Sequence, residues 1–372
     1  MTASPTRPPV CANALAERLT RLVQTPSISR QESAVADLVA GELSQAGLVV
    51  QRHLNNVWCE FGDAPRPRML LNSHLDTVPP AQGWCADPWT PRIIDERLIG
   101  LGANDAKGCV AAMMHAALAL HAALHGGQKL GGTLVLALTA EEEISGVGLS
   151  EILARLGPID AALVGEPTGL TPRIAQRGLL VLRCTARGRT SHPANTPPDT
   201  PNNAIQNACD DLRRMREFDW GPPHPLLGRT HAHVTRIQGG VANNVVPDSC
   251  EFLLDIRTTP GETHAALTAR LRAHLRSEIA VHSERLVPVS TPEEAAIVRA
   301  VLRALPGARP AGSPAMSDMV FLAGIPSVKI GPGQSPRSHT PDEFILLDEL
   351  SAGAAAYERI AREFFQQDVG KK

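Results

Sequence analysis

Apolar runs that stop abruptly at polar residues recur along the first half of the chain. Residues 69–71 are apolar, and His74 and Asp76 follow almost at once. The run 134–138 ends before three consecutive glutamates, and the run 161–164 ends before another glutamate. Runs of this length are typical of buried strands. Because burying an unpaired polar group costs about 2–7 kcal/mol, we expect the residues at the strand ends to find partners elsewhere in the chain.

Helical segments separate these strands. A capping-box pattern at Ser29 and Glu32 predicts a helix that ends near Gly47. The uncharged stretch 108–124 is short for a membrane span, rich in alanine and contains two histidines, so we expect a buried helix. Alternating strands and helices predict an α/β domain with a mostly parallel sheet, whose ligands bind beyond the carboxyl ends of the strands. Six candidate residues fall at such ends: His74, Asp76, Asp105, Glu142, Glu143 and Glu166.

The pattern changes between residues 178 and 288. Strand and helix signals there follow the order βαββαβ, which is the ferredoxin-like arrangement of a small α+β domain. After it the chain returns to helix, strand and helix. We therefore predict a catalytic α/β domain (1–177 and 289–372) interrupted by an inserted domain (178–288).

Composition restricts the classes of function. The 372 residues carry 36 basic and 38 acidic side chains and only 3% aromatic residues, so nothing indicates nucleic-acid binding. Seven scattered cysteines without a C-x-x-C motif argue against a disulfide scaffold and suggest a reducing compartment. The first residues lack the apolar core of a signal peptide. We expect a cytoplasmic protein with no nucleic-acid or membrane partner.

The candidate chemistry is metal binding. Five residues could hold two divalent ions, namely His74, Asp105, Glu143, Glu166 and His339. Imidazole and carboxylate donors without thiolates suit zinc, cobalt or manganese. Asp105 could bridge two ions, Asp76 could accept a hydrogen bond from His74, and Glu142 could transfer protons. Each short motif alone is also common at ordinary strand ends and solvated helix starts, so the residues alone leave coincidence as an alternative.

Five motifs in order make a resemblance visible: "SHLDTVP", "GLGANDAKG", "TAEEE", "VGEPT" and "SHTPDE". The chain resembles the dizinc deacylase and exopeptidase family, which includes acetylornithine deacetylase, succinyl-diaminopimelate desuccinylase and glutamate carboxypeptidases. The resemblance implies that His74 and Glu166 hold one ion, that Glu143 and His339 hold the other, and that Asp105 bridges them. It also implies that Asp76 orients His74 and that Glu142 is the general base.

The same resemblance implies roles for the inserted domain. That domain would dimerise, and His192 would reach the partner's active site to stabilise the oxyanion. Asn244 and Arg257 would hold the carboxylate of the substrate, and Gly331 and Gly333 would let the main chain approach it. By themselves His192 could be an ordinary loop histidine and Arg257 an ordinary surface charge.

Two departures from the family pattern affect these assignments. Glu141 stands where the family commonly has aspartate, so the roles of the three glutamates 141–143 could shift by one position. The stretch after His192 is rich in proline, so this loop could differ from that of other members.

The first candidate activity is hydrolysis of N-acetylornithine, in arginine biosynthesis, by a homodimer. The alternatives are deacetylation of N-acetylcitrulline, desuccinylation of succinyl-diaminopimelate, cleavage of dipeptides or of a carboxyl-terminal residue, and release of lysine or ornithine from an amino-group carrier protein. A binding protein that kept the fold but lost the chemistry should lack ligands or base, and here every one is present.

Overall fold

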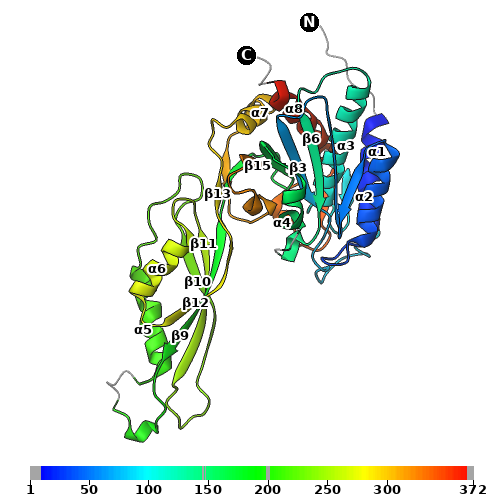
Figure 1. Ribbon diagram of the computed structural model, residues 1–372. Coiled ribbons are helices and arrows are strands. Elements are labelled where there is room, and N and C mark those ends of the chain that lie inside the picture. Colours follow the sequence, from blue (N-terminus) through cyan, green and yellow to red (C-terminus); the bar gives the residue numbers. More distant parts are fainter. Residues whose placement is uncertain (1–9, 145, 147, 198–201, 367–372) are drawn as a thin grey trace. The chain divides into compact units, whose positions relative to one another are not determined.

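The computed structural model describes residues 10–144, 146, 148–197 and 202–366 (Figure 1). The chain forms two compact units. The first contains the residues up to 174, residues 291–311 and residues from 317 onward. The second contains residues 175–290 and the short segment 312–316.

A parallel sheet forms the centre of the first unit. Its strands β6, β3, β7 and β15 lie in this order and run in the same direction. Their bounds are Thr133–Thr139, Arg68–His74, Ala161–Val164 and Ser327–Lys329. Antiparallel strands extend the edges: β1 (Val50–His53) and β2 (Asn56–Gly62) beside β6, then β8 (Arg173–Gln176), β13 (Val289–Ser290) and β14 (Ala311–Ser313) beyond β15. The predicted α/β fold with a mostly parallel central sheet is confirmed.

Helices pack around this sheet (Figure 1). They are α1 (Val10–Gln24), α2 (Ser33–Gln45), α3 (Lys107–His125), α4 (Gly148–Ile152), α7 (Ala296–Ala304) and α8 (Leu347–Gln366). Among the described helices only α3 is long and apolar enough to cross a membrane. It contacts α1, α8, β3 and β6, and most of its residues are buried, as in the core helix of a globular domain.

The predicted capping box is wrong. Helix α2 begins at Ser33, its N-cap residue is Glu32, and no side chain caps it. The Ser29 hydroxyl donates to the carboxylate of Asp76 instead, and the Glu32 carboxylate accepts from the main-chain N–H groups of Arg30 and Glu141.

A small three-stranded sheet lies next to the loop that carries Asp105. Its strands are β4 (Arg92–Ile94), β5 (Arg97–Ile99) and β16 (Phe344–Leu346), in the order β16-β5-β4. Strand β5 comes shortly before Asp105 in the chain, and β16 comes shortly after His339. Their pairing therefore brings together two segments that are more than 200 residues apart.

The second unit has the predicted βαββαβ order. Its elements are β9 (Gly178–Arg187), α5 (Ala204–Glu217), β10 (His231–Gly239), β11 (Ser249–Thr258), α6 (His264–His274) and β12 (Glu278–Leu286). The antiparallel sheet has the order β10-β11-β9-β12. Alternate residues of β9 and β11 are buried in one apolar core with residues of α5 and α6, which is why the strands alternate in sequence.

Candidate metal centre

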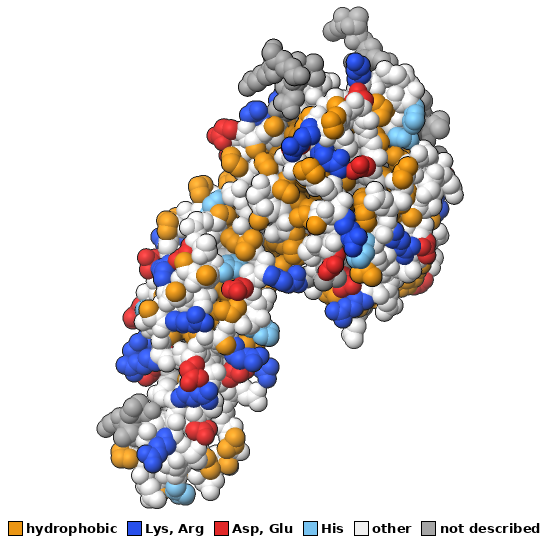
Figure 2. Space-filling view, in the orientation of Figure 1, with side chains coloured by type: hydrophobic (Ala, Val, Ile, Leu, Met, Phe, Trp, Pro, Cys, Tyr) orange, Lys and Arg blue, Asp and Glu red, His pale blue; other side chains and the backbone are white. Residues whose placement is uncertain are grey.

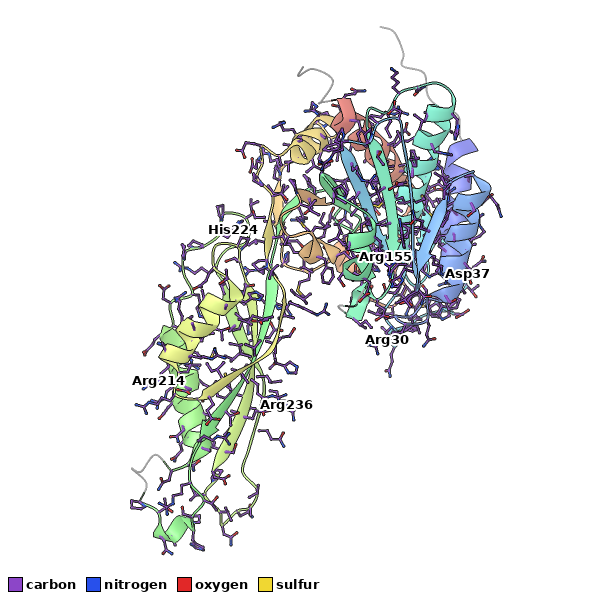
Figure 3. All side chains as sticks on the ribbon, viewed as in Figure 1. Arg30, Asp37, Arg155, Arg214, His224 and Arg236 are labelled. Atoms are coloured by element: carbon purple, nitrogen blue, oxygen red, sulfur yellow. The ribbon has the colours of Figure 1, made fainter. Side chains whose placement is uncertain are left out.

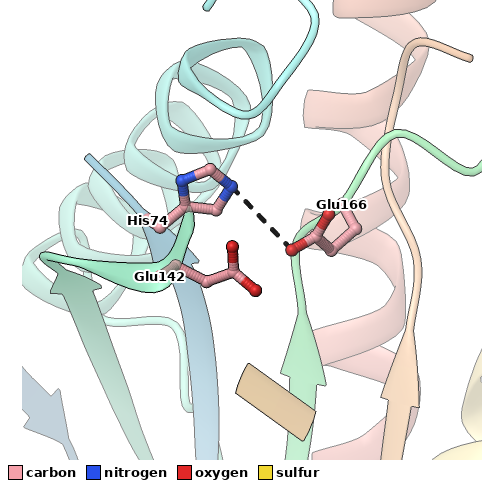
Figure 4. Close-up of side chains that lie close together, drawn as sticks. All are labelled: His74, Glu142 and Glu166. Carbon is pink, nitrogen blue, oxygen red and sulfur yellow. Dashed lines mark ion pairs between the residues drawn. The ribbon is translucent and has the colours of Figure 1, made fainter. Parts of the chain in front are cut away.

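Three parallel strands bring acidic residues to one edge of the central sheet. His74 is the last residue of β3, and Glu166 follows β7 by two residues. Glu142 lies in a short 3-10 helix, Glu142–Ile144, just beyond β6. Figure 4 shows Glu142 and Glu166 facing the space beside the imidazole of His74, whose Nε2 is 3.9 Å from Glu166 Oε1. This is where an open α/β sheet places its ligands.

Asp105 connects the two histidines. Its Oδ1 is 3.3 Å from His74 Nε2, and its Oδ2 is 3.7 Å from His339 Nε2. His339 Nε2 also lies 3.0 Å from the carboxylate of Glu143. One carboxylate thus presents a separate oxygen to each histidine, an arrangement from which Asp105 could bridge two ions.

The donors form two overlapping groups whose ligand atoms lie within 4.8 Å of one another. One group is His74, Glu142 and Glu166, and the other is His74, Asp105 and Glu143. Imidazole nitrogens and carboxylate oxygens without thiolate fit zinc, cobalt or manganese.

The electrostatics of the centre also fit a cation. Burial, reinforced by the charge of Asp105, raises the pKa of Glu166 to about 8. Burial and the charge of Glu166 likewise raise the pKa of Glu142 well above its usual range. Carboxylates that face one another in a buried site favour protonation, and a divalent cation removes that repulsion.

Asp76 contacts both the imidazole of His74 and the turn formed by residues 141–143, called the glutamate turn. His74 Nδ1 lies 3.0 Å from the main-chain oxygen of Asp76 and 3.4 Å from its carboxylate. The carboxylate accepts hydrogen bonds from the main-chain N–H groups of Glu142 and Glu143, at 3.0 and 3.1 Å, and from the Ser29 hydroxyl at 2.7 Å. Burial alone would raise the pKa of Asp76, but the hydrogen bond and charge of His74 outweigh it and lower that pKa.

The turn separates the three glutamates. Glu141 has a left-handed φ of 57°, and its N–H donates to Glu32 Oε1 at 3.2 Å. Its carboxylate lies 3.6 Å from the guanidinium of Arg30, which is largely exposed to solvent (Figure 3). Glu142 and Glu143 instead belong to the two donor groups. Glu141 thus lies outside both groups, and the roles of Glu142 as base and Glu143 as ligand stay predictions.

Two buried ionisable residues near the centre were missed by sequence reasoning. Asp318 is 3% exposed and accepts a hydrogen bond from the Thr139 hydroxyl, at the end of β6, at 2.8 Å. Burial raises the pKa of Asp318 to about 6. Lys329, at the end of β15, is also buried; burial lowers its pKa, and the charge of Glu166 opposes this. The only signal in the sequence was the position of Lys329 between Val328 and Ile330, inside a segment that predicts a strand.

The predicted residues of the inserted domain lie in the second unit, whereas all five predicted ligands lie in the first. His192 is exposed, and its Nδ1 accepts a hydrogen bond from the Ala194 N–H. The guanidinium of Arg257 pairs with Asp255, its Nε 2.7 Å from Oδ1. Asn244 is exposed. Of the proline-rich stretch after His192, residues 198–201 lie outside the described part of the chain.

The two glycines of the "GPG" segment lie against the protein's own atoms. A Cβ at Gly331 would come within 2.6 Å of Cys109 Sγ, and one at Gly333 would overlap the side chain of Asn104. Gly333 also has a φ of 80°, which favours glycine. Close packing beside Glu166 is thus sufficient to require glycine at both positions.

Comparison with known proteins agrees with this geometry. Residues 70–363 match the model of peptidase family M20/M25/M40. A succinyl-diaminopimelate desuccinylase from Stenotrophomonas maltophilia is 32% identical over 91% of this chain and 96% of that protein. An acetylornithine deacetylase from Edwardsiella ictaluri is 31% identical over 93% and 96%.

Solved structures share the fold. Aminopeptidase PepT from Bacillus cereus superposes with a TM-score of 0.78 at 20% identity, over 95% of this chain and 98% of that one. The YXEP protein from Bacillus subtilis, described as a dinuclear metal-binding peptidase, gives a TM-score of 0.74 at 17% identity, over 96% and 99%. The chain therefore belongs to peptidase family M20/M25/M40, and it is a metal-dependent hydrolase of amide bonds.

Proposed function

We propose that this enzyme removes a short acyl group from the amino nitrogen of an N-acyl amino acid. The observation that carries the proposal is the position of Asp105, which offers one oxygen toward His74 and the other toward His339. The relatives that are about 30% identical along the whole chain are named for deacylation of amino acids.

The protein's own residues have separate tasks in this reaction. His74 and Glu166 would hold one ion, Glu143 and His339 the other, and Asp105 both. Bound there, the ions would polarise the scissile carbonyl and make the attacking water more acidic. Glu142 accepts the proton of that water and delivers it to the leaving nitrogen. Asp76 keeps the His74 ring and the glutamate turn in place through its four hydrogen-bonded groups.

Zinc is the first candidate for both ions, with cobalt and manganese as alternatives. The donor set supports all three, because none of them requires a thiolate. The metal content of protein purified without added chelator, and the activity after reconstitution with each metal, decide among them.

The acyl group is either acetyl or succinyl. The chain is 32% identical to a desuccinylase and 31% identical to an acetylornithine deacetylase, so identity does not rank the two. N-acetylornithine, a substrate in arginine biosynthesis, therefore stands beside N-succinyl-diaminopimelate. The test measures kcat/KM of the metal-reconstituted enzyme for these two compounds, for N-acetylcitrulline and for simple dipeptides. One of the acylated amino acids should have a clearly higher kcat/KM than the other compounds. Failure to hydrolyse any of them would overturn the deacylase proposal.

Arg257 is our candidate for holding the substrate carboxylate, with Asn244 of the same unit as a second candidate. A guanidinium fork suits bidentate capture of a carboxylate. Arg257 already pairs with Asp255, so the substrate would compete with that carboxylate. Arg257→Lys should raise KM more than it lowers kcat, whereas an unchanged KM would exclude this role.

The exposed edge of the second unit supports a homodimer. Most of β10 is exposed, including Val234 and Ile237, and β10 is an edge strand. Figure 3 shows Arg236 on this strand pointing away from the helix that carries Arg214. A second copy of β10 could pair with this edge, and the partner's His192 could then act as the oxyanion donor. Light scattering of wild type and of Ile237→Lys tests the dimer.

Surface charge gives no support to an acidic carrier protein as the substrate. Figure 2 shows basic and acidic side chains interspersed over the visible face, without a field of one sign. A small-molecule substrate accords better with this surface and with a formal charge of −2. A cytoplasmic location is proposed from the seven scattered cysteines, not from the charge.

A further inference from the structure

Two buried side chains join the segment that carries Asp105 to the segment that carries His339. Asn104 Nδ2 donates to Gln334 O at 3.1 Å and to Ser338 Oγ at 3.2 Å, and its Oδ1 accepts from Gln334 N–H at 2.8 Å. Glu343 Oε1 accepts from the N–H groups of Asn104 and Asp105, both at 2.8 Å. Asn104 is fully buried and Glu343 nearly so.

These contacts continue the small sheet toward the metal centre. Phe344 of β16 pairs with Ile99 of β5, and Gly100 N–H donates to Glu343 O at 2.9 Å. The two segments therefore run side by side from the sheet to the ligands. Asn104 and Glu343 are the last links before Asp105 and His339.

The two halves of the centre are supported differently. His74 ends a strand inside the parallel ladder, and Glu166 follows another strand by two residues. Glu143 lies in a 3-10 turn, and His339 lies in an irregular segment with its side chain half exposed. His339 also has a left-handed φ of 61°. A non-glycine residue keeps such a conformation only where its surroundings determine it strongly.

We propose that Asn104 and Glu343 are positioning residues for the metal position formed by Glu143, His339 and Asp105. They fix His339 and Asp105 relative to each other, so that this position is preorganised before an ion binds. The position formed by His74 and Glu166 depends on the central sheet and much less on these two residues. The inference rests on the two-metal centre of the proposed function but not on the identity of the substrate.

Metal binding without substrate tests the proposal. Wild type, Asn104→Ala, Glu343→Ala and Glu343→Gln are titrated with Zn²⁺ against a chelating indicator after removal of metal, and bound zinc is counted by mass spectrometry. Asn104→Ala and Glu343→Ala should each lower the affinity for one of the two zinc ions by about 10–100-fold. This is the usual effect of removing a residue that hydrogen-bonds and orients a metal ligand. The other ion should keep its affinity within about threefold, by the same reasoning. Glu343→Gln keeps a carbonyl acceptor and should recover most of the lost affinity.

The chain offers a matched control in the second unit. Asp211 is a fully buried carboxylate that accepts from the N–H groups of Arg276 and Ser277 and from the Ser277 hydroxyl. Asp211→Asn disturbs a similar set of hydrogen bonds to a buried carboxylate, at a position distant in sequence from every predicted ligand. It should lower the unfolding temperature and leave the affinities of both ions unchanged, whereas a purely structural effect would weaken metal binding in this variant too.

Three results would overturn the proposal. Asn104→Ala and Glu343→Ala could retain two ions with wild-type affinity, or they could weaken both ions equally. Wild type could also bind only one ion, which would overturn the two-metal centre of the proposed function as well. Absence of hydrolysis with two ions bound would contradict the proposed substrate class alone.

Discussion

Asp211 of the second unit and Glu166 of the first are both largely buried carboxylates, but their neighbours differ. Asp211 in the second unit is surrounded by N–H and O–H donors, which balance its charge from within the protein. Glu166 in the first unit faces Asp105, Glu142 and Glu143, and its pKa rises to about 8. A buried acid whose partners are donors holds the fold together. Buried acids whose neighbours are other acids mark a site prepared for a cation.

The histidines repeat this contrast. His264 in the second unit is buried between the Thr258 hydroxyl and the main-chain oxygen of Glu284, at 2.9 and 2.8 Å. His74 and His339 instead direct their Nε2 atoms at carboxylates. Residue type is the same in both units, so the neighbours decide whether a histidine is structural or a ligand.

Removal of metal should have the largest effect. Chelation should reduce hydrolysis to background, because both carbonyl polarisation and water activation are lost. It should also lower the unfolding temperature of the first unit, since ligands bind only the folded state. Activity assays and calorimetry before and after readdition of zinc measure both. Full activity in protein shown to be free of metal would contradict the claim that the buried acids of the first unit form a cation site.

The second prediction concerns Glu142→Ala. Loss of the proton acceptor should reduce kcat/KM by about 10²–10⁴-fold. Both ions should stay bound, because Glu142 is assigned to proton transfer and Glu143 to metal. Kinetics and metal counting on the same sample check this. A variant that loses an ion would show that base and ligand have been exchanged.

The third prediction compares Glu166→Gln with Asp211→Asn in metal-free protein. Glu166→Gln should raise the free energy of unfolding by about 1–2 kcal/mol at pH 7. Folding raises the pKa of Glu166 to about 8 and so requires that carboxyl to take up a proton, whereas glutamine needs none. Asp211→Asn should lower it by about 1–3 kcal/mol, because buried donors lose their acceptor. Denaturant titrations measure both. The same sign in the two variants would refute the distinction drawn here.

The smallest effect is the pH dependence of His264. Burial lowers the pKa of His264, so its contribution to stability is complete above the unfolded pKa of about 6.5. That contribution is lost as pH falls through this value toward the folded pKa, because the unfolded chain takes up the proton first. The stability difference between wild type and His264→Gln should therefore shrink between pH 7.5 and 5.5. A difference that grows on acidification would contradict the neutral, structural histidine.

Much of the site could be predicted because its ligands end strands. His74 and Glu166 each stand within three residues of the end of an apolar run, where the sequence changes from apolar to polar residues. The three glutamates were harder, since nothing local shows that Glu141 adopts a left-handed φ and turns toward Arg30. Ser29 and Glu32 were misread for a related reason. Their spacing matches a capping box. In the structure, however, the Ser29 hydroxyl donates to Asp76 and the Glu32 carboxylate accepts from the N–H of Glu141.

Asn104, Asp318 and Glu343 carry no comparable signal. Asn104 and Glu343 are some 240 positions apart and meet only because β5 pairs with β16. Asp318 meets Thr139 only through the return of the chain after the second unit. Periodicity, apolar runs and short motifs are local, so the chain's order alone was enough to predict the α/β layers and the βαββαβ unit. The set of donors was named from the strand ends together with the family resemblance. Only the tertiary structure decided how the oxygens of Asp105 lie relative to the histidine nitrogens, and that Asn104 and Glu343 hold this segment. These distances depend on long-range packing, because they arise only when segments remote in sequence share one core.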